Sequence, residues 1–102
     1  MKRLSEETRK EIDRDPFYRQ CCLTGKKPVQ LHHWFKFGKG QVDKPFAILP
    51  LHKTIHDQAH APELAERIEW VGLNRMTRGE LLHYSKVRDL RKRRDELNFK
   101  FA

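Results

Sequence analysis

The sequence predicts an α+β fold, with a β-hairpin and a short helix at its centre and further helices toward both ends. Two apolar runs, at residues 29–35 and 46–49, enclose a glycine-containing loop, a pattern typical of a hairpin. Capping signals precede segments of helical period on both sides of the hairpin. With 102 residues and no internal repeat, the chain is expected to form a single domain over residues 1–102.

The N-terminal part predicts a polar helix and a turn before the first strand. Ser5 is a suitable N-cap for a helix that runs to about Arg14, and Asp15-Pro16 ends it. The segment at residues 22–25 is typical of a turn. If residues 29–35 are extended, His32 and His33 point to opposite faces of the strand.

The middle of the chain predicts the rest of the hairpin and a short helix. Residues 35–44 are expected to form a loop, and residues 46–49 the returning strand. Thr54 is the expected N-cap of a helix over residues 55–60, which either ends near Ala61-Pro62 or restarts there with proline as its first residue. In such a helix, His56 and His60 project from one face.

Two helices are expected over about residues 62–98. Leu64, Ile68 and Val71 give the first an apolar side, and it ends around residues 72–74. A capping box at residues 77–80 then starts one long helix that continues to about residue 98. Its predicted inward stripe consists of Tyr84, Val87, Leu90 and Leu97.

Charge and cysteine content restrict the class of partner. The chain has 22 Lys and Arg against 14 Asp and Glu, so its formal net charge of +8 favours a polyanion such as DNA, although a solubilising surface gives a similar balance. No apolar stretch reaches the roughly 18 residues of a membrane-spanning helix, so no membrane partner is expected. The adjacent Cys21 and Cys22 fit a reducing compartment, which favours a cytoplasmic location.

Histidines are the most informative residues of the chain. Five of the six lie within residues 31–60, as His32-His33, His52, His56 and His60. Neutral imidazoles are common ligands of divalent metals, and a further imidazole can exchange protons near neutral pH. This grouping indicates a metal site with a histidine left over for proton transfer.

The tandem His32-His33, the hairpin-like interval, the Leu49-Pro50-Leu51 segment and His56-x3-His60 together resemble the HNH, or ββα-metal, endonuclease motif. The resemblance covers about residues 22–60, and the helices of about residues 62–98 lie outside it. The pattern is similar to that of nuclease colicins and of small phage-encoded HNH proteins, which implies a host's cytoplasm if the chain is phage-encoded. It implies an enzyme that hydrolyses phosphodiester bonds in DNA, leaving a 3′-hydroxyl and a 5′-phosphate.

The resemblance also implies a role for each histidine of the motif. His33 corresponds to the general base that activates a water molecule, and His32, His56 and His60 correspond to ligands of one divalent metal ion. Three imidazoles suit zinc or nickel, while an open site that adds water and phosphate oxygens also admits manganese or magnesium.

Two positions depart from the family pattern. Ala47 stands where the family has an asparagine or histidine that orients the base, and a methyl group forms no hydrogen bond. We expect reduced activity, replacement by Asp43 or by a backbone carbonyl, or an inactive protein. Cys22 and His52 align with one residue from each pair of a structural zinc knuckle, but Gly25 and Ile55 replace their partners, so hydrogen bonding or packing is favoured over zinc binding.

Basic residues near the motif and near the C-terminus are candidates for nucleic-acid contacts. Those singled out are Lys36, Lys39, Lys44, Arg91 and Arg94. In the first group the lysines alternate with phenylalanines, which are expected to face mostly inward. An ordinary solvated surface is the competing interpretation of the C-terminal group.

Three functions remain open at this point. The leading one is a metal-dependent DNA endonuclease. The second is a catalytically inactive HNH-like module that binds nucleic acid or a nucleoprotein complex, which the alanine at position 47 favours. The third is a structural metal domain within a larger assembly, in which the ion stabilises a small core.

Overall fold

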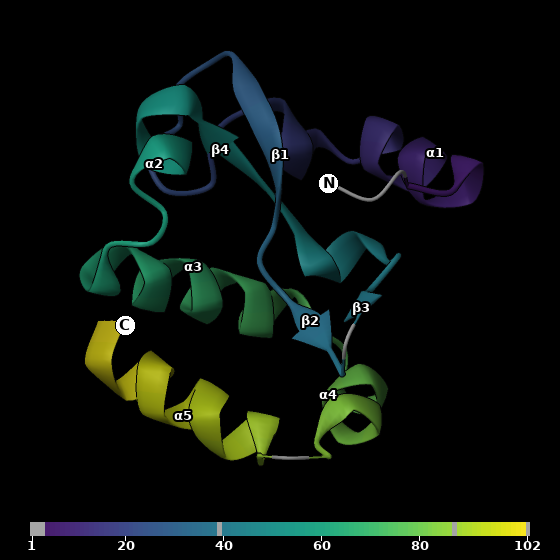
Figure 1. Cartoon of the computed structure of the whole chain (residues 1–102), viewed down its shortest axis with the longest axis vertical. Coiled ribbons are helices and arrows are strands. Elements are labelled where there is room, and N and C mark those ends of the chain that lie inside the picture. The colour runs from purple at the N-terminus through teal and green to yellow at the C-terminus, as the bar shows by residue number, and fades with distance from the viewer. Residues whose placement is uncertain (1–3, 39, 87, 102) are drawn as a thin grey trace.

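The computed structural model describes residues 4–38, 40–86 and 88–101. It has an α+β fold, as predicted, in which a β-hairpin lies above a pair of long helices (Figure 1). Lys39 and Val87, both named above, lie outside the described residues. The elements in chain order are α1 (Glu6–Arg14), the 3-10 turn η1 (Pro16–Arg19), β1 (Val29–His33), β2 (Lys36–Phe37), β3 (Gly40–Gln41), the 3-10 turn η2 (Pro45–Ala47), β4 (Ile48–His52), α2 (Lys53–Asp57), α3 (Pro62–Arg75), α4 (Arg78–Tyr84) and α5 (Leu90–Phe101).

The predicted N-terminal helix is confirmed as α1. The Ser5 hydroxyl accepts a hydrogen bond from the backbone N–H of Thr8, so it is the N-cap, and the helix ends at Arg14. Ile12 packs from α1 against Tyr18 and Ile48, so this polar helix is attached to the hairpin by few apolar side chains.

The predicted hairpin forms between β1 and β4, which pair antiparallel from Val29 opposite His52 to His33 opposite Ile48. The returning strand begins two residues later than expected, because the segment 45–47 turns as η2 and sends Phe46 and Ala47 into the core. The intervening loop also contains a small hairpin of its own, since β2 pairs with β3.

The helix that follows the hairpin differs from the prediction in cap and length. His52, not Thr54, is the N-cap of α2, and its Nδ1 accepts a hydrogen bond from the backbone N–H of Thr54 at 3.3 Å. The helix ends at Asp57, so His60 lies in the turn between α2 and α3 rather than on the same helix as His56. The prediction that these two histidines share one face of a helix is therefore wrong.

The next helix, α3, continues through the glycine at which its end was predicted. Gly72 is buried within α3 because the indole ring of Trp34 packs over it and leaves no space for a side chain. The glycine thus serves a close approach between α3 and the residue after β1, and the helix ends three residues later at Arg75.

The single long C-terminal helix that was predicted is two helices. Thr77 and Glu80 form the expected capping box at the start of α4, but α4 ends at Tyr84. The Ser85 hydroxyl then donates to the Leu81 carbonyl at 2.6 Å and accepts from the Leu90 N–H at 3.1 Å, which satisfies backbone groups on both sides of the break. The chain turns here, and α5 lies alongside α3 (Figure 1).

Leu90 and Leu97 of the predicted inward stripe are buried, at 2% and 1% exposure, and they join a core with Phe46, Ala47 and Leu73. This core joins the C-terminal helices to the end of the hairpin. Among the helices that the structure describes, none has the length and apolar character needed to cross a membrane.

Candidate metal and nucleic-acid site

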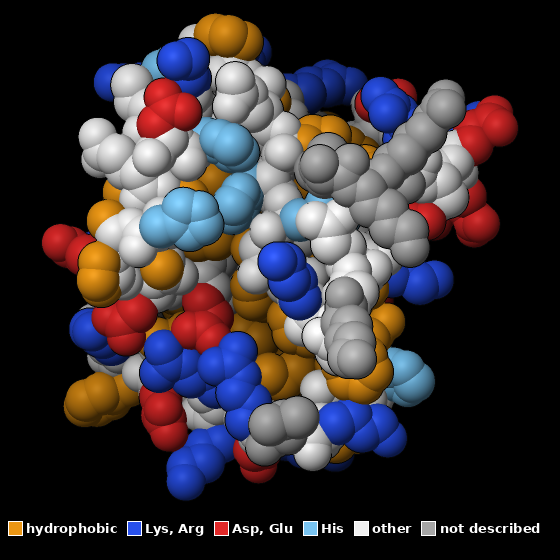
Figure 2. All heavy atoms as spheres, in the orientation of Figure 1, with side chains coloured by type: hydrophobic (Ala, Val, Ile, Leu, Met, Phe, Trp, Pro, Cys, Tyr) orange, Lys and Arg blue, Asp and Glu red, His pale blue; other side chains and the backbone are white. Residues whose placement is uncertain are grey.

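A cleft of about 710 Å³ opens between the hairpin and the C-terminal helices. Histidines occupy one side of it and charged residues from the C-terminal half the other, and Figure 2 shows several imidazoles gathered on this face next to a mixed group of basic and acidic side chains. The polar residues that line the cleft are His32, His33, Lys36, His60, Glu66, Glu69, Tyr84, Lys86 and Arg88.

His32 and His56 are in direct contact. Their rings meet edge to face, with centroids 5.2 Å apart, so β1 and α2 bring together two of the three predicted metal ligands. Burial lowers the pKa of His32, and the neighbouring charges of His56 and His60 lower it further. His32 is therefore held in the neutral form, which is the form that binds a metal ion.

His33 points to a different environment from His32, as expected for adjacent strand residues. Burial lowers its pKa, while the Val42 backbone and the negative charge of Asp43 act in the opposite direction. Its Nδ1 is buried and makes no well-formed hydrogen bond with any residue that the structure describes. A neutral imidazole is the form that accepts a proton.

Asp43, considered above as a substitute for the missing asparagine, is already engaged. Both of its carboxylate oxygens accept from the Ser5 N–H at 3.2 Å, and its backbone carbonyl accepts from the Thr8 hydroxyl. The carboxylate therefore fixes the start of α1 beside the site and acts on His33 through its charge.

The donor chemistry of the histidine set fits a divalent transition metal, because all three predicted ligands are imidazoles and His32 is kept neutral. In their present orientations, no three His, Cys, Asp or Glu side chains among the described residues form a group that can hold a metal ion.

Ala47 is completely buried and belongs to the core with Phe35 and Leu73. Its carbonyl oxygen accepts from the Trp34 N–H at 3.1 Å. The position expected to orient the base is therefore a packing position, and its side chain makes no polar contribution to the cleft.

Cys22 and His52 have structural contacts where a zinc knuckle was considered. The Cys22 N–H donates to the Pro50 carbonyl at 3.0 Å, and burial, followed by the charge of Cys21, raises the Cys22 pKa to about 12. His52 caps α2, as described above.

Of the five basic residues predicted to contact nucleic acid, the four that the structure describes do not form one surface. Lys36 lines the cleft. Lys44 is exposed before η2, and Arg91 lines a separate hollow of about 830 Å³ beside α4 and α5. Arg94 is half-buried, with one nitrogen 3.4 Å from Asp95. Lys39 lies outside the described residues.

Two basic residues of the C-terminal segment face the histidines across the cleft, at a place that the predicted continuous helix did not allow for. Lys86 and Arg88 lie in the break between α4 and α5, which had been predicted as continuous helix. Ser85 was the available signal, because a residue of its type can satisfy the backbone at a helix end.

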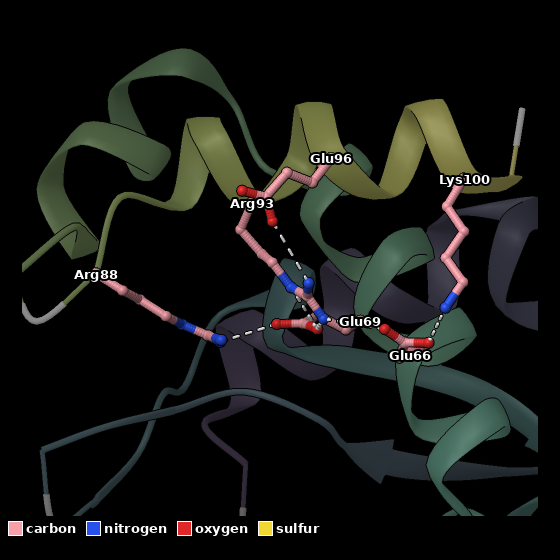
Figure 3. A network of polar contacts seen from close by, with 6 residues as sticks. All are labelled: Glu66, Glu69, Arg88, Arg93, Glu96 and Lys100. Atoms are coloured by element: carbon pink, nitrogen blue, oxygen red, sulfur yellow. Dashed lines mark hydrogen bonds and ion pairs between the residues drawn. The ribbon is translucent and has the colours of Figure 1, made fainter.

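Arg88 is anchored by an ion-pair network that was also not predicted (Figure 3). It lies 2.9 Å from Glu69 of α3, and Glu69 also accepts two hydrogen bonds from Arg93 of α5, at 2.9 and 3.1 Å. Glu66 pairs in turn with Lys100 at 2.5 Å. The network joins α5 to α3 and directs Arg88 along the wall of the cleft.

Comparison with known proteins identifies no relative: no family model, curated protein or solved structure matches the chain.

Proposed function

We propose that this protein is a metal-dependent endonuclease of the HNH type that hydrolyses phosphodiester bonds in DNA. The observation that carries the proposal is the contact of His32 at the end of β1 with His56 of α2, beside a cleft that His33 and His60 also line. The order of the hairpin and α2 along the chain supports the proposal.

The proposed reaction divides the work between the histidines. His33 takes a proton from the attacking water, and the negative charge of Asp43 favours the resulting imidazolium. His32, His56 and His60 hold the divalent ion. When bound, that ion supplies positive charge to the phosphate and to the leaving oxygen. Lys86 and Arg88, across the cleft, attract the DNA backbone.

A plasmid-nicking assay with zinc, nickel, manganese or magnesium tests the proposal. The parent chain is expected to nick, and His33→Ala to lose at least about 100-fold in rate, the usual contribution of general-base catalysis. His52→Asn is the matched control, because asparagine also caps a helix and the change removes a histidine outside the proposed set. Absence of nicking with every metal, or equal loss in both variants, rejects the endonuclease.

The second candidate is a catalytically inactive module that binds nucleic acid or a nucleoprotein complex. The burial of Ala47 favours it, since no side chain at this position orients His33. This function predicts salt-sensitive DNA binding in the same assay mixtures without nicking under any metal.

A further inference from the structure

The small β2–β3 hairpin carries one phenylalanine that departs from the inward packing of its neighbours. Phe35 and Phe46 are 6% and 4% exposed, whereas Phe37 is 36% exposed. Phe37 pairs with Gly40 in the hairpin, and the intervening Gly38 has a φ of 63°, a conformation that favours glycine. The ring of Phe37 thus lines the cleft.

The inner side of the Phe37 ring rests on two aromatic side chains of α4. Tyr84 meets it edge to face with centroids 5.0 Å apart, and His83 lies at 6.4 Å with an interplanar angle of 30°. Tyr84 and His83 also contact each other, at 4.7 Å. The three rings restrict the orientation of Phe37, so a planar partner that stacks on its exposed part meets a surface that is already ordered.

Three cations line the same cleft as Phe37 and Tyr84. Lys36 and Lys86 are exposed, and neither forms an ion pair with another residue among those described. Arg88 is held nearby by Glu69. An exposed aromatic ring flanked by free cations is the combination with which proteins bind single-stranded nucleic acid, since rings stack on bases and cations contact phosphates.

We propose that Phe37, supported by Tyr84 and His83, is a stacking site for an unpaired nucleobase, with Lys36 and Lys86 on the adjoining phosphates. The inference rests on the proposed function and specifies its substrate: single-stranded or locally opened DNA is bound in preference to intact duplex. Bases stacked within a duplex do not offer a free face to Phe37, whereas an unpaired base does.

Binding in the absence of metal tests this site separately from cleavage. The full chain in chelator is titrated into a labelled oligothymidylate, a hairpin duplex of equal phosphate number, and a strand of abasic sites, with fluorescence anisotropy as the readout. Phe37→Leu is expected to weaken binding to the oligothymidylate by about tenfold, and Phe37→Trp to retain it. Because Lys36 and Lys86 are unchanged, the salt dependence of binding stays the same.

Phe99→Leu is the matched control, since Phe99 is 93% exposed on α5 and does not line the cleft. Its affinity for all three ligands should equal that of the parent, and thermal unfolding of each variant checks the fold. Equal loss of oligothymidylate and abasic-strand binding in Phe37→Leu overturns the proposal, as does an unchanged affinity or a preference for duplex. Binding that depends on Phe37, without nicking, overturns the endonuclease alone. Nicking together with metal-free binding that does not depend on Phe37 overturns this site alone.

Discussion

The indole ring of Trp34 lies so close to Gly72 that a β-carbon at position 72 would be 2.1 Å from Cε2 of the ring. Trp34 is held in place by its backbone N–H, which donates to Ala47, and by its indole N–H, which donates to the Phe46 carbonyl at 2.6 Å. The residue after His33 is therefore fixed between η2 and α3. The position of the proposed base depends on this contact.

Gly72→Ala should destabilise the protein although alanine is the better helix former. The new methyl group must displace the Trp34 ring, and overpacking of this kind costs about 1–3 kcal/mol, more than the ~1 kcal/mol gained from helix propensity. Chemical denaturation measures the loss. Gly79→Ala in α4 is the control, because a β-carbon there meets nothing within 4 Å, and it should be neutral or slightly stabilising. Equal stability of the two variants would contradict the packing described here.

Glu69→Gln should loosen α5 from α3. Glu69 is 15% exposed and pairs with both Arg88 and Arg93, so its neutralisation removes the carboxylate partner of Arg88 and leaves Arg93 with Glu66 and Glu96 alone. The expected loss is about 1–3 kcal/mol in the free energy of unfolding. Glu96→Gln, at the exposed margin of the network, should change it by less than about 0.5 kcal/mol. Hydrogen exchange in α5 distinguishes local release from global unfolding, and a larger effect of the Glu96 variant would refute this ranking.

Acidification should remove a stabilising contribution of Asp15. A hydrogen bond from the Phe17 backbone, followed by the pairing with Arg75 at 2.7 Å, lowers its pKa below the ordinary value of 3.8. The unfolded chain therefore takes up a proton before the folded one does, so the contribution is present above pH 3.8 and is lost as the pH falls through the folded pKa.

Asp15→Asn keeps an oxygen for the Phe17 N–H and removes the charge. This variant should be less stable than the parent near neutral pH by about 0.2–1 kcal/mol, and the two should converge at low pH. Asp13→Asn, on the exposed side of α1, serves as the control and should run parallel to the parent. Denaturation curves from neutral pH to below pH 3.8 provide the comparison. A constant difference in stability between the parent and Asp15→Asn would argue against a pH-dependent contribution of Asp15.

Zinc or nickel should raise the melting temperature if the histidine set binds a metal. Saturation at about 100 times the dissociation constant adds about 2.7 kcal/mol to the stability of the folded state. His56→Ala should abolish the effect and His52→Asn should retain it, since His52 caps α2 and lies outside the proposed set. Chelator should reverse the shift. A shift of the same size in both variants would indicate metal binding elsewhere.

Local signals in the sequence were sufficient for the elements that depend on neighbouring residues. Ser5 and the Thr77–Glu80 box fix the starts of α1 and α4, because a cap requires only residues within one turn. The alternating apolar runs were also sufficient for the hairpin, although its register depends on η2.

Contacts between distant residues account for what was missed. Gly72 resembles a helix end until Trp34 is placed against it. The interruption of the helix at Ser85 depends on the packing of α5 against α3. The cleft combines residues from β1, the β2–β3 hairpin and the α4–α5 turn, so its cations were not identifiable from spacing. The contact of His32 with His56 was predicted as part of a metal site, whereas the place of His60 was not.

The turn that holds His60 has a consequence for how such a site changes during evolution. Its backbone is tied by bonds from Ala59 to His56 and from Ala61 to Gln58, so the number of residues in the turn, rather than the pitch of a helix, sets how far His60 reaches. Insertion or deletion of one residue there shifts a single imidazole and leaves β1, β4 and α2 intact. Length variation in this turn would therefore change the position of His60 without a change in the hairpin.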